Sequence, residues 1–534
     1  MRQKINNCFH ILYGCLFFLI ISLLLLVHEA IQYPCKRTFP LHNVTVFLLI
    51  IVLGLLLFLI TNAVKRISAT PKFQNFRFKI NYLKIMWVSA VVLFFLQVYI
   101  SYNIVFTSKW DVYNVNLAAQ QWAAGHSEKV TSFYNFSRYP NNLFITLCQA
   151  AILKLNNAFG IFQEVYANMA IVCVNCLFST VTCVLVFKIV NLYQSQKYAF
   201  AGYILSIMLY GFSPWVTICY SDAFGILFPV LSFYLYAKPR KSLKTKIVFC
   251  ALAASIACIG YLIKPQCIII LIAAVITEFL FNLGKANLKK LAMVFFVAVY
   301  TAAFYFLLNT ALNSFYKKSS IVINKEDTFS MTHFAMMGLN EKNSGVYYDD
   351  DITISKNFKT AAERKNGNIT VIKSRLHAMG PVRLTKHLAK KMLISYHDGT
   401  FAWGGEGTFY YQVPKPLNSK ISPFLRSVYY NSGSRYLYFQ SISTFVWMTV
   451  ILLNFAAVFQ KRNAQPNPKL CVLFLSIIGL TAFQLLFEVR ARYLYTYLPI
   501  YCIIAVFGLK NFNCLCGKAV NTAKKLFKKR ALQK

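Results

Sequence analysis

Long apolar runs recur along this 534-residue chain and constrain its fold more than any other feature. Each run is roughly 17 to 23 residues long, the length that a helix needs to cross the hydrocarbon core of a bilayer. The composition agrees, with 57% hydrophobic residues and a mean hydropathy of +0.51. The sequence therefore predicts an all-α polytopic membrane protein with about twelve transmembrane helices, at residues 10–28, 44–63, 84–105, 167–190, 198–216, 222–237, 247–263, 267–283, 290–310, 440–459, 470–487 and 494–510.

Basic loops between these runs predict that the N and C termini are cytoplasmic, because Lys and Arg resist translocation. The loops at 64–83, 238–246, 284–289 and 460–469 are all basic, and all fall on the cytoplasmic side if the N-terminus does. The first run lacks the small-residue cleavage pattern of a signal peptide, so it is expected to remain as a span. The predicted location is the cell membrane, crossed many times.

The spans and loops divide the chain into four expected parts. These are a membrane domain at 1–310 that includes an outer loop at 106–166, an extracytoplasmic loop or cap domain at 311–438, C-terminal membrane helices at 439–510, and a basic cytoplasmic tail at 511–534. The apolar stretch 141–159 contains Gln149, Lys154, Asn156 and Asn157, and a crossing there would invert every later loop. It is therefore expected to lie against the outer leaflet.

The predicted outer region 311–438 contains no cysteine, so no disulfide can order it. Apolar spacing predicts helices at 361–379 and 382–396, separated by Gly380 and Pro381. The run Trp-Gly-Gly-Glu-Gly at 403–407 is predicted to be a tight surface loop.

Acidic residues are scarce, 16 against 56 Lys plus Arg, and the net charge is +40. In a membrane chain this excess indicates contact with anionic membrane lipids rather than with nucleic acid. Most acidic residues fall on the predicted outer side. This distribution needs no functional explanation, because acidic residues interfere little with translocation whereas basic residues are held back. Asp111, Asp222 and Glu488 differ because they lie beside span ends, where a charge commonly has a function. No Walker loop, dinucleotide glycine pattern or H-E-x-x-H motif occurs.

Five short motifs follow one another along the predicted outer face: Trp110-Asp111-Val112-Tyr113, Arg138-Tyr139-Pro140-Asn141-Asn142, Tyr220-Ser221-Asp222, Lys264-Pro265, and Glu488-Val489-Arg490-Ala491-Arg492-Tyr493. Together they resemble the GT-C class of integral-membrane glycosyltransferases, especially the protein O-mannosyltransferase and aminoarabinose transferase relatives of glycosyltransferase family 39. The chain departs from that pattern in two ways. Two spans precede the span that leads into the Asp111 loop, and no second acid adjoins Asp111.

The resemblance implies a transferase that moves a sugar from a polyprenyl-phosphate donor to an envelope glycan, lipid or protein acceptor at the outer face. It implies that Asp111 is the catalytic base of an inverting displacement. It also implies substrate or carrier binding by a set of outer-face residues: Arg138, Tyr139, Tyr220, Asp222, Lys264, His333, Glu488, Arg490, Arg492 and Tyr493. No cofactor is expected, and a divalent metal stays open.

Three of these residues also have ordinary structural interpretations. Asp111 is placed to cap a helix beginning near Val112, and Asp222 to cap the span at 222–237. Lys264 is placed to be a snorkelling anchor at a span end. The sequence leaves both interpretations open for each residue.

The remaining candidates likewise have alternatives. Glu488, Arg490 and Arg492 form either a phosphate clamp or an ion-paired turn without substrate contact. His333 either lines the mouth of a cavity or packs in a core. The three aspartates at 349–351 are either a hard-cation site or solvated side chains.

Other functions also fit a twelve-span chain. A transporter or flippase of lipid-linked sugar is one, although the sequence shows no internal repeat of the kind that carriers carry. An envelope glycan polymerase or ligase would use a similar lipid carrier. A structural or partner-binding role would be favoured if Asp111 proved replaceable.

Overall fold

Helices make up most of the part of the chain that the structure describes, and the connections between them include one long segment at 397–420. The computed structural model describes residues 1–27, 42–67, 80–163, 166–283, 288–459 and 465–531. Within these ranges no β-strand forms, and extended segments pair only at an isolated antiparallel bridge between Thr107 and Gln412. The predicted all-α class is confirmed.

The α-helices are α1 (Arg2–Leu26), α2 (Asn43–Ile67), α4 (Tyr82–Asn103), α5 (Asp111–Ala123), α6 (Val130–Phe133), α7 (Leu143–Phe159), α8 (Met169–Tyr193), α9 (Gln196–Ser206), α10 (Ser221–Phe224), α11 (Leu227–Ala237), α12 (Leu243–Ile263), α13 (Ile269–Asn282), α14 (Leu288–Lys318), α15 (Met331–Gly338), α16 (Asp349–Lys356), α17 (Ala361–Tyr396), α18 (Ile421–Tyr429), α19 (Tyr436–Ala456), α20 (Pro468–Leu486) and α21 (Leu498–Ala531). Short 3-10 helices include η5 (Pro214–Thr217), η6 (Pro265–Ile268) and η8 (Ala491–Tyr497), and η4 (Ile207–Gly211) is a π-helix.

Ten helical segments in the described ranges are long and apolar enough to cross a membrane, and they match ten of the twelve predicted spans. They are α1, α2, α4, α8, α12, α13 with the turn before it, α14, α19, α20, and α21 with the turn before it. The other two predicted spans are broken. The run 198–216 is divided at Ser213. α9 and η4 precede this residue, and η5 follows it, beginning at Pro214. The run 222–237 is a shorter apolar segment divided into α10 and α11.

The spans form a centre and a periphery. The span α8 is 67% buried by its neighbours and α20 56%, whereas α2 is 11% and α14 only 6% buried. The centre is tightly packed because small residues let helices approach. A Cβ at Gly508 of α21 would overlap the carbonyl oxygen of Leu453 on α19. The nearly bare apolar faces of α2 and α14 suit a lipid environment.

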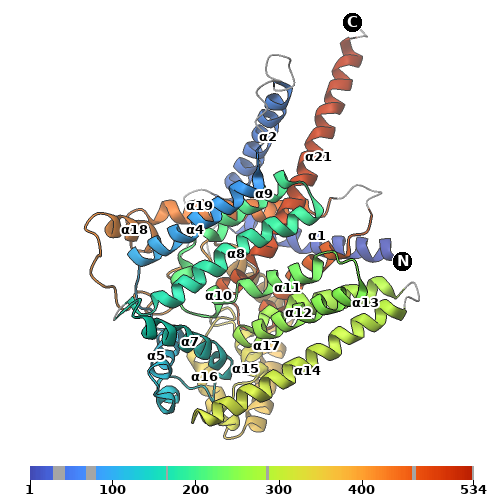
Figure 1. Cartoon of the computed structure of the whole chain (residues 1–534). Helices are drawn as coiled ribbons and strands as arrows, with labels where there is room; N and C mark the ends of the chain where they lie inside the picture. The colour runs from blue at the N-terminus through green and yellow to red at the C-terminus, as the bar shows by residue number, and fades with distance from the viewer. Residues whose placement is uncertain (28–41, 68–79, 164–165, 284–287, 460–464, 532–534) are drawn as a thin grey trace.

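The helices outside this bundle gather at one end of it. Figure 1 shows α5 and α7 at the lower left and α15, α16 and α17 at the bottom, whereas the N-terminus lies at the right. α7 packs beside α5 and is not among the segments of span length, in keeping with its predicted surface position. α17 is two helices that meet at Gly380, where φ is +57°, and Pro381, so the predicted break is confirmed.

Candidate active site

Three turns of the helical bundle meet at the end that carries α5. One precedes α10, one joins α12 to η6, and one joins α20 to η8. Lys264 ends α12 in an extended conformation with φ −152°, as a residue before proline prefers, and Pro265 then begins η6. Gly260, one turn earlier, lies where a Cβ would come within 2.7 Å of the Phe228 Cβ. The missing side chain therefore lets α12 approach α11 and brings Lys264 to the start of α10.

A network of buried ion pairs occupies this meeting point. Both oxygens of Asp222 are used: Oδ1 accepts a hydrogen bond from Lys264 Nζ, and Oδ2 accepts one from Arg492 Nη1 at 2.5 Å. The Asp222 side chain is fully buried, and Lys264 is 4% exposed. Isolated charges are costly to bury, so each of these groups depends on its partners.

The network continues through a second carboxylate, that of Glu406. Arg492 Nε donates to Glu406 Oε1 at 2.8 Å, and Arg490 Nη1 donates to Glu406 Oε2 at 2.7 Å. Burial opposes ionisation of Glu406, but the two guanidinium groups outweigh it and lower the pKa of this carboxyl. Arg490 Nε also donates to Glu488 Oε1 at 2.9 Å, and Tyr493 donates to Glu488 Oε2 at 3.2 Å. We call these six charged residues the ion cluster: Asp222, Lys264, Glu406, Glu488, Arg490 and Arg492.

Glu406 was not predicted to be part of a site, and the prediction of a surface loop at 403–407 is wrong. Trp403 is completely buried and Glu406 is 8% exposed. Asp398 holds the start of this loop by accepting hydrogen bonds from the backbone amides of Thr400 and Ala402 at 2.9 and 2.8 Å. The loop enters the protein because its aromatic side chains pack inward, and it carries the lone acid with them. The sequence did contain one signal that could have identified Glu406: a single acidic residue between glycines in a segment rich in aromatic residues.

The backbone of this loop is under local strain. Phe401 and Ala402 have φ of +57° and +60°, a left-handed conformation that side chains with a Cβ adopt rarely. Such positions cost of order 1–3 kcal/mol each and persist only when their surroundings hold them. Here the Trp215 indole holds the loop, since its Nε1 donates to the carbonyl of Thr400 at 2.9 Å.

Asp111 lies at the first position of α5, next to the ion cluster. Trp110 is the residue that joins them: its ring lies 4.7 Å from the guanidinium carbon of Arg492 and 5.1 Å from the ring of Tyr220. Asp111 does not cap α5, because the N-cap is Trp110 and no side-chain cap bond forms there. The capping interpretation of Asp111 is therefore wrong.

The surroundings of Asp111 are enclosed but not closed. The side chain is exposed, yet burial by the surrounding protein raises its pKa; Arg492 offsets part of that effect and Glu488 adds to it. We call the surroundings of this carboxyl the Asp111 recess. The carboxyl of Asp111 also acts electrostatically on Tyr134, Tyr139 and Tyr220, so these three tyrosines lie near it.

Two other structural interpretations can be decided. Asp222 accepts no cap bond at the start of α10 and binds Lys264 and Arg492 instead, so the capping interpretation is wrong. Lys264 is buried against Asp222 rather than extended to the surface, so the snorkelling interpretation is wrong. Within the turn, Arg490 pairs with Glu488, and both Arg490 and Arg492 pair with Glu406, which the sequence did not connect to them. Whether this turn contacts substrate stays a prediction.

Arg138 and Tyr139 both pack against Phe329, and Tyr139 also lies near Asp111. The Arg138 guanidinium lies 5.3 Å from the Phe329 ring centre, and the Arg138 carbonyl accepts a hydrogen bond from the Phe329 amide at 3.1 Å. The Tyr139 ring packs edge-on against Phe329 at 5.5 Å. Tyr220 is buried and donates to Asn142 Oδ1 at 3.2 Å, and Asn142 in turn donates to Tyr134 at 2.7 Å. These contacts fix the Arg138 motif between the Asp111 recess and the segment after α14.

His333 lies apart from the ion cluster. Its side chain is fully buried on α15, its ring centre is 4.1 Å from that of Phe329, and Nδ1 bonds to Ser355 Oγ at 2.7 Å. Burial lowers the pKa of His333 to about 3, and Arg138 contributes to the shift. The described contacts are those of a packed histidine, kept neutral, and none joins it to Asp111 or to the ion cluster.

The three aspartates at 349–351 do not converge. Asp351 is buried and accepts from Arg375 at 2.5 Å and from Asn340 at 2.9 Å, Asp349 accepts from Tyr347, and Asp350 lies 4.0 Å from Lys342. Among the residues that the structure describes, no group of three or more His, Cys, Asp or Glu side chains is arranged to hold a metal ion. The cation-site interpretation of this run is wrong.

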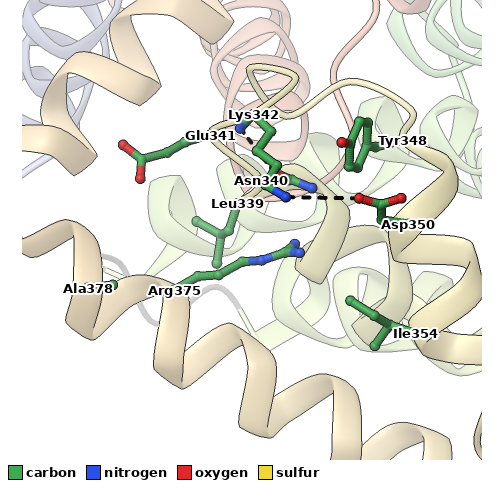
Figure 2. Close-up of a pocket in the computed structure, with 9 residues that line it drawn as sticks. All are labelled: Leu339, Asn340, Glu341, Lys342, Tyr348, Asp350, Ile354, Arg375 and Ala378. Atoms are coloured by element: carbon green, nitrogen blue, oxygen red, sulfur yellow. Dashed lines mark hydrogen bonds and ion pairs between the residues drawn. The ribbon is translucent and has the colours of Figure 1, made fainter.

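The Asp350 region instead borders a pocket of ≈ 250 Å³ between α15, α16 and α17. Figure 2 shows Lys342 reaching toward Asp350 across it, with Arg375 on the α17 side. A second pocket, of ≈ 360 Å³, lies between residues 131–137 and Asp327. Neither pocket is lined by the ion cluster, whose side chains are packed against one another.

Fold and site together define a multi-pass membrane protein that carries a buried ion cluster beside an accessible carboxylate at one end of its helical bundle. Residues 1–512 match the model of a family described as conserved hypothetical integral membrane protein, and the chain belongs to that family. The sequence matches none of the curated proteins.

Among solved structures, the chain resembles the archaeal oligosaccharyltransferase AglB from Archaeoglobus fulgidus, determined in complex with an inhibitory peptide and a dolichol-phosphate. The similarity has a TM-score of 0.39 and 12% sequence identity, and it covers 85% of this chain. The chain spans about half, 51%, of the length of that protein. A similarity at this level is a loose likeness in the arrangement of helices.

Proposed function

We propose that this protein transfers a sugar from a polyprenyl-phosphate donor to an acceptor at the outer face of the membrane, with Asp111 as the catalytic base. The proposal is carried by the surroundings of Asp111. Its carboxyl is accessible, its pKa is raised, and it lies at the α5 end of the helical bundle, next to buried Arg and Lys side chains. A base is more effective when its pKa approaches the working pH, and crowding by the recess acts in that direction.

The proposed reaction is a single displacement at the anomeric carbon of the donor. The acceptor hydroxyl oxygen forms the new bond to that carbon while the bond from the carbon to the carrier phosphate oxygen breaks. The hydroxyl proton passes to the Asp111 carboxylate, and the bonding electrons leave with the phosphate. One displacement inverts the configuration of the sugar.

The leaving phosphate requires cations, and the candidate cations differ in whether carboxylates of the protein already bind them. Lys264, Arg490 and Arg492 are engaged by the carboxylates of the ion cluster. Arg492 uses Nε and Nη1 in its ion pairs, which leaves Nη2 without a bond to either carboxylate. Arg138 has no ion pair with any carboxylate in the described ranges, and we propose it as the main phosphate ligand.

The ion cluster then has a positioning role in this proposal. Its three cations and three carboxylates balance, so it adds little net charge to the recess. Its contribution is to fix Arg492 against Trp110 and thereby the first turn of α5. A base held within a fraction of an ångström of its productive position gains rate that a mobile one loses.

The test compares envelope glycans, by mass spectrometry and linkage analysis, in cells that carry the wild-type chain, no chain, or Asp111→Asn. The expected result is that one sugar substituent disappears in both altered strains while lipid-linked sugar accumulates. Glu128→Gln is the matched control, because Glu128 is exposed on the same outer loop and pairs with His126 instead of the cluster. Glycans that change on deletion but not with Asp111→Asn would overturn the assignment and favour transport of the carrier or glycan.

The same comparison separates the possible acceptors. Loss of a substituent from a polysaccharide, a lipid or a protein fraction identifies which class receives the sugar. Shorter glycan chains, without loss of a substituent, would instead favour a polymerase or ligase.

A further inference from the structure

The segment between Glu406 and α19 has an unusual charge and an unusual orientation. From residue 407 to 438 it carries four basic side chains and no acidic one. These are Lys415, Lys420, Arg426 and Arg435. Its central element, α18, is nine residues long, or about 13 Å, too short to cross a bilayer.

α18 is amphipathic, and its polar side faces the protein. Ser422 is fully buried and donates to Asn103 Oδ1 at 2.7 Å. Arg426, one turn later, donates to the carbonyls of Asn103 at 3.3 Å and Pro414 at 2.9 Å. Ser422 and Arg426 therefore attach this helix to the end of α4 and to the segment that precedes α18, and Arg426 stays partly exposed.

Part of the apolar side of α18 faces outward. Ile421 is 37% exposed and Phe424 52% exposed, whereas Leu425 and Val428 pack against the cluster formed by Ile104, Tyr429 and Tyr430. Further exposed apolar side chains lie on the segments beside the helix: Val413, Leu417, Leu437 and Tyr438. An outward apolar surface of this extent requires an apolar environment.

The position of α18 indicates which environment that is. Asn103, which receives its polar side, is the last residue of the span α4, and Tyr436 begins the span α19. Figure 1 shows α18 beside the ends of α4 and α19, at the opposite side of the molecule from the N-terminus. The helix therefore lies at the level where two spans leave the membrane.

We infer that residues 411–438 form an interfacial platform that inserts its apolar side into the outer leaflet and binds anionic phospholipid headgroups through Lys415, Lys420 and Arg435. Short helices with an apolar side and flanking cations bind membrane surfaces in this way. Charge complementarity favours anionic over zwitterionic headgroups, because the segment offers cations without any competing carboxylate. The inference does not depend on the proposed transfer reaction.

The platform also adjoins the Asp111 recess. Thr107 and Gln412 form the antiparallel bridge, with a 2.8 Å bond from the Thr107 amide, and the Lys109 amide donates to the Thr408 carbonyl at 3.1 Å. Asp111 follows two residues later. A lipid bound at the platform would therefore lie close to the recess along the chain.

The first experiment measures depth. Full-length protein carrying Phe424→Trp is reconstituted in phosphatidylcholine vesicles that contain phosphatidylglycerol, and quenching by lipids brominated on their acyl chains is measured after subtraction of the wild-type signal. We expect strong quenching at position 424. The control is Thr131→Trp, an exposed position in the polar pocket of the first outer loop. Equal quenching at the two positions would overturn membrane insertion and favour a protein partner for this surface.

The second experiment measures headgroup preference. In the Phe424→Trp protein, quenching by brominated phosphatidylglycerol is compared with quenching by brominated phosphatidylcholine. We expect phosphatidylglycerol to be preferred about threefold or more, and the preference to fall in 0.5 M salt (about a 4 Å screening length). The variant Lys415→Gln, Lys420→Gln, Arg435→Gln should abolish it.

A matched variant removes the same charge elsewhere: Lys356→Gln, Lys359→Gln, Lys365→Gln, three exposed lysines of α16 and α17 and the turn between them. This variant should retain the preference. If both triple variants retain it, or both lose it, the three cations of the platform are not the headgroup ligands.

Discussion

Replacing Asp222 by Asn would remove the one carboxylate that holds both Lys264 and Arg492. The wild-type ion cluster balances three cations with three carboxylates, and the substitution leaves a net charge of +1 in a buried site. Arg492 keeps Glu406 as a partner, but Lys264 keeps none within the cluster. Removing one member of a buried ion pair costs about 3–5 kcal/mol, and we expect a loss of that size in the free energy of unfolding.

The companion variants isolate the cause. Lys264→Met alone leaves a net charge of −1, and the loss should again be about 3–5 kcal/mol. The double variant Asp222→Asn, Lys264→Met restores neutrality, so its loss should be well below the sum of the two single losses. The free energies are measured by reversible denaturation in mixed micelles, as a double-mutant cycle.

An exposed ion pair provides the control. Arg383 and Glu341 lie as close, at 2.5 Å, but their side chains are 59% and 37% exposed. Solvent screens such a pair, so Glu341→Gln should cost about 1 kcal/mol at most. Additive losses in the cycle, or a loss for Asp222→Asn no larger than that for Glu341→Gln, would refute the description of Asp222 as a buried counter-ion.

Three further outcomes are expected. Burial raises the pKa of Asp111, so the folded protein keeps this proton to higher pH than the unfolded chain, and stability falls as pH rises through that interval. The variant Asp111→Asn should therefore be at least as stable as wild type at pH 7 in a thermal unfolding assay. Its rate of sugar transfer should fall about 100- to 10,000-fold. The buried ammonium of Lys391 donates to three backbone carbonyls. The variant Lys391→Met should therefore reduce the free energy of unfolding by about 3 kcal/mol or more, measured by reversible denaturation in mixed micelles. A reduction under about 1 kcal/mol would contradict this role of Lys391. Gly508→Val should destabilise by about 3 kcal/mol or more through overlap with the Leu453 carbonyl, and an unchanged melting temperature would show that α19 and α21 can separate without loss.

Much of the fold followed from local sequence because span length and helix breaks are local properties. Apolar runs of sufficient length predicted the ten helices of span length, and the Gly380-Pro381 pair predicted the break in α17. Two predicted spans were wrong, and the reason is again a local property of the backbone. Hydropathy over 198–216 and 222–237 could not reveal the backbone breaks at Pro214 and between α10 and α11, because these interrupt the helix without changing its apolar character.

The candidate site was predicted in part. Asp222, Lys264, Arg490 and Arg492 were each singled out, but their mutual pairing was not, because they lie up to 270 residues apart. Glu406 was missed, since a Gly-rich loop with one acid has the composition of a surface turn. Whether Asp111, Arg138 and the other candidates contact substrate stays a prediction.

Consecutive residues were enough to predict a multi-pass helical membrane protein, because a bilayer demands continuous apolar helices and each such helix is a single run of sequence. The positions of the charges depended on packing instead. Buried ions are stable only when opposite charges from distant segments meet, and that meeting depends on how the helices pack. The same packing left Ile421 and Phe424 of α18 exposed, and left Asp111 accessible beside a cluster in which the other charges are paired.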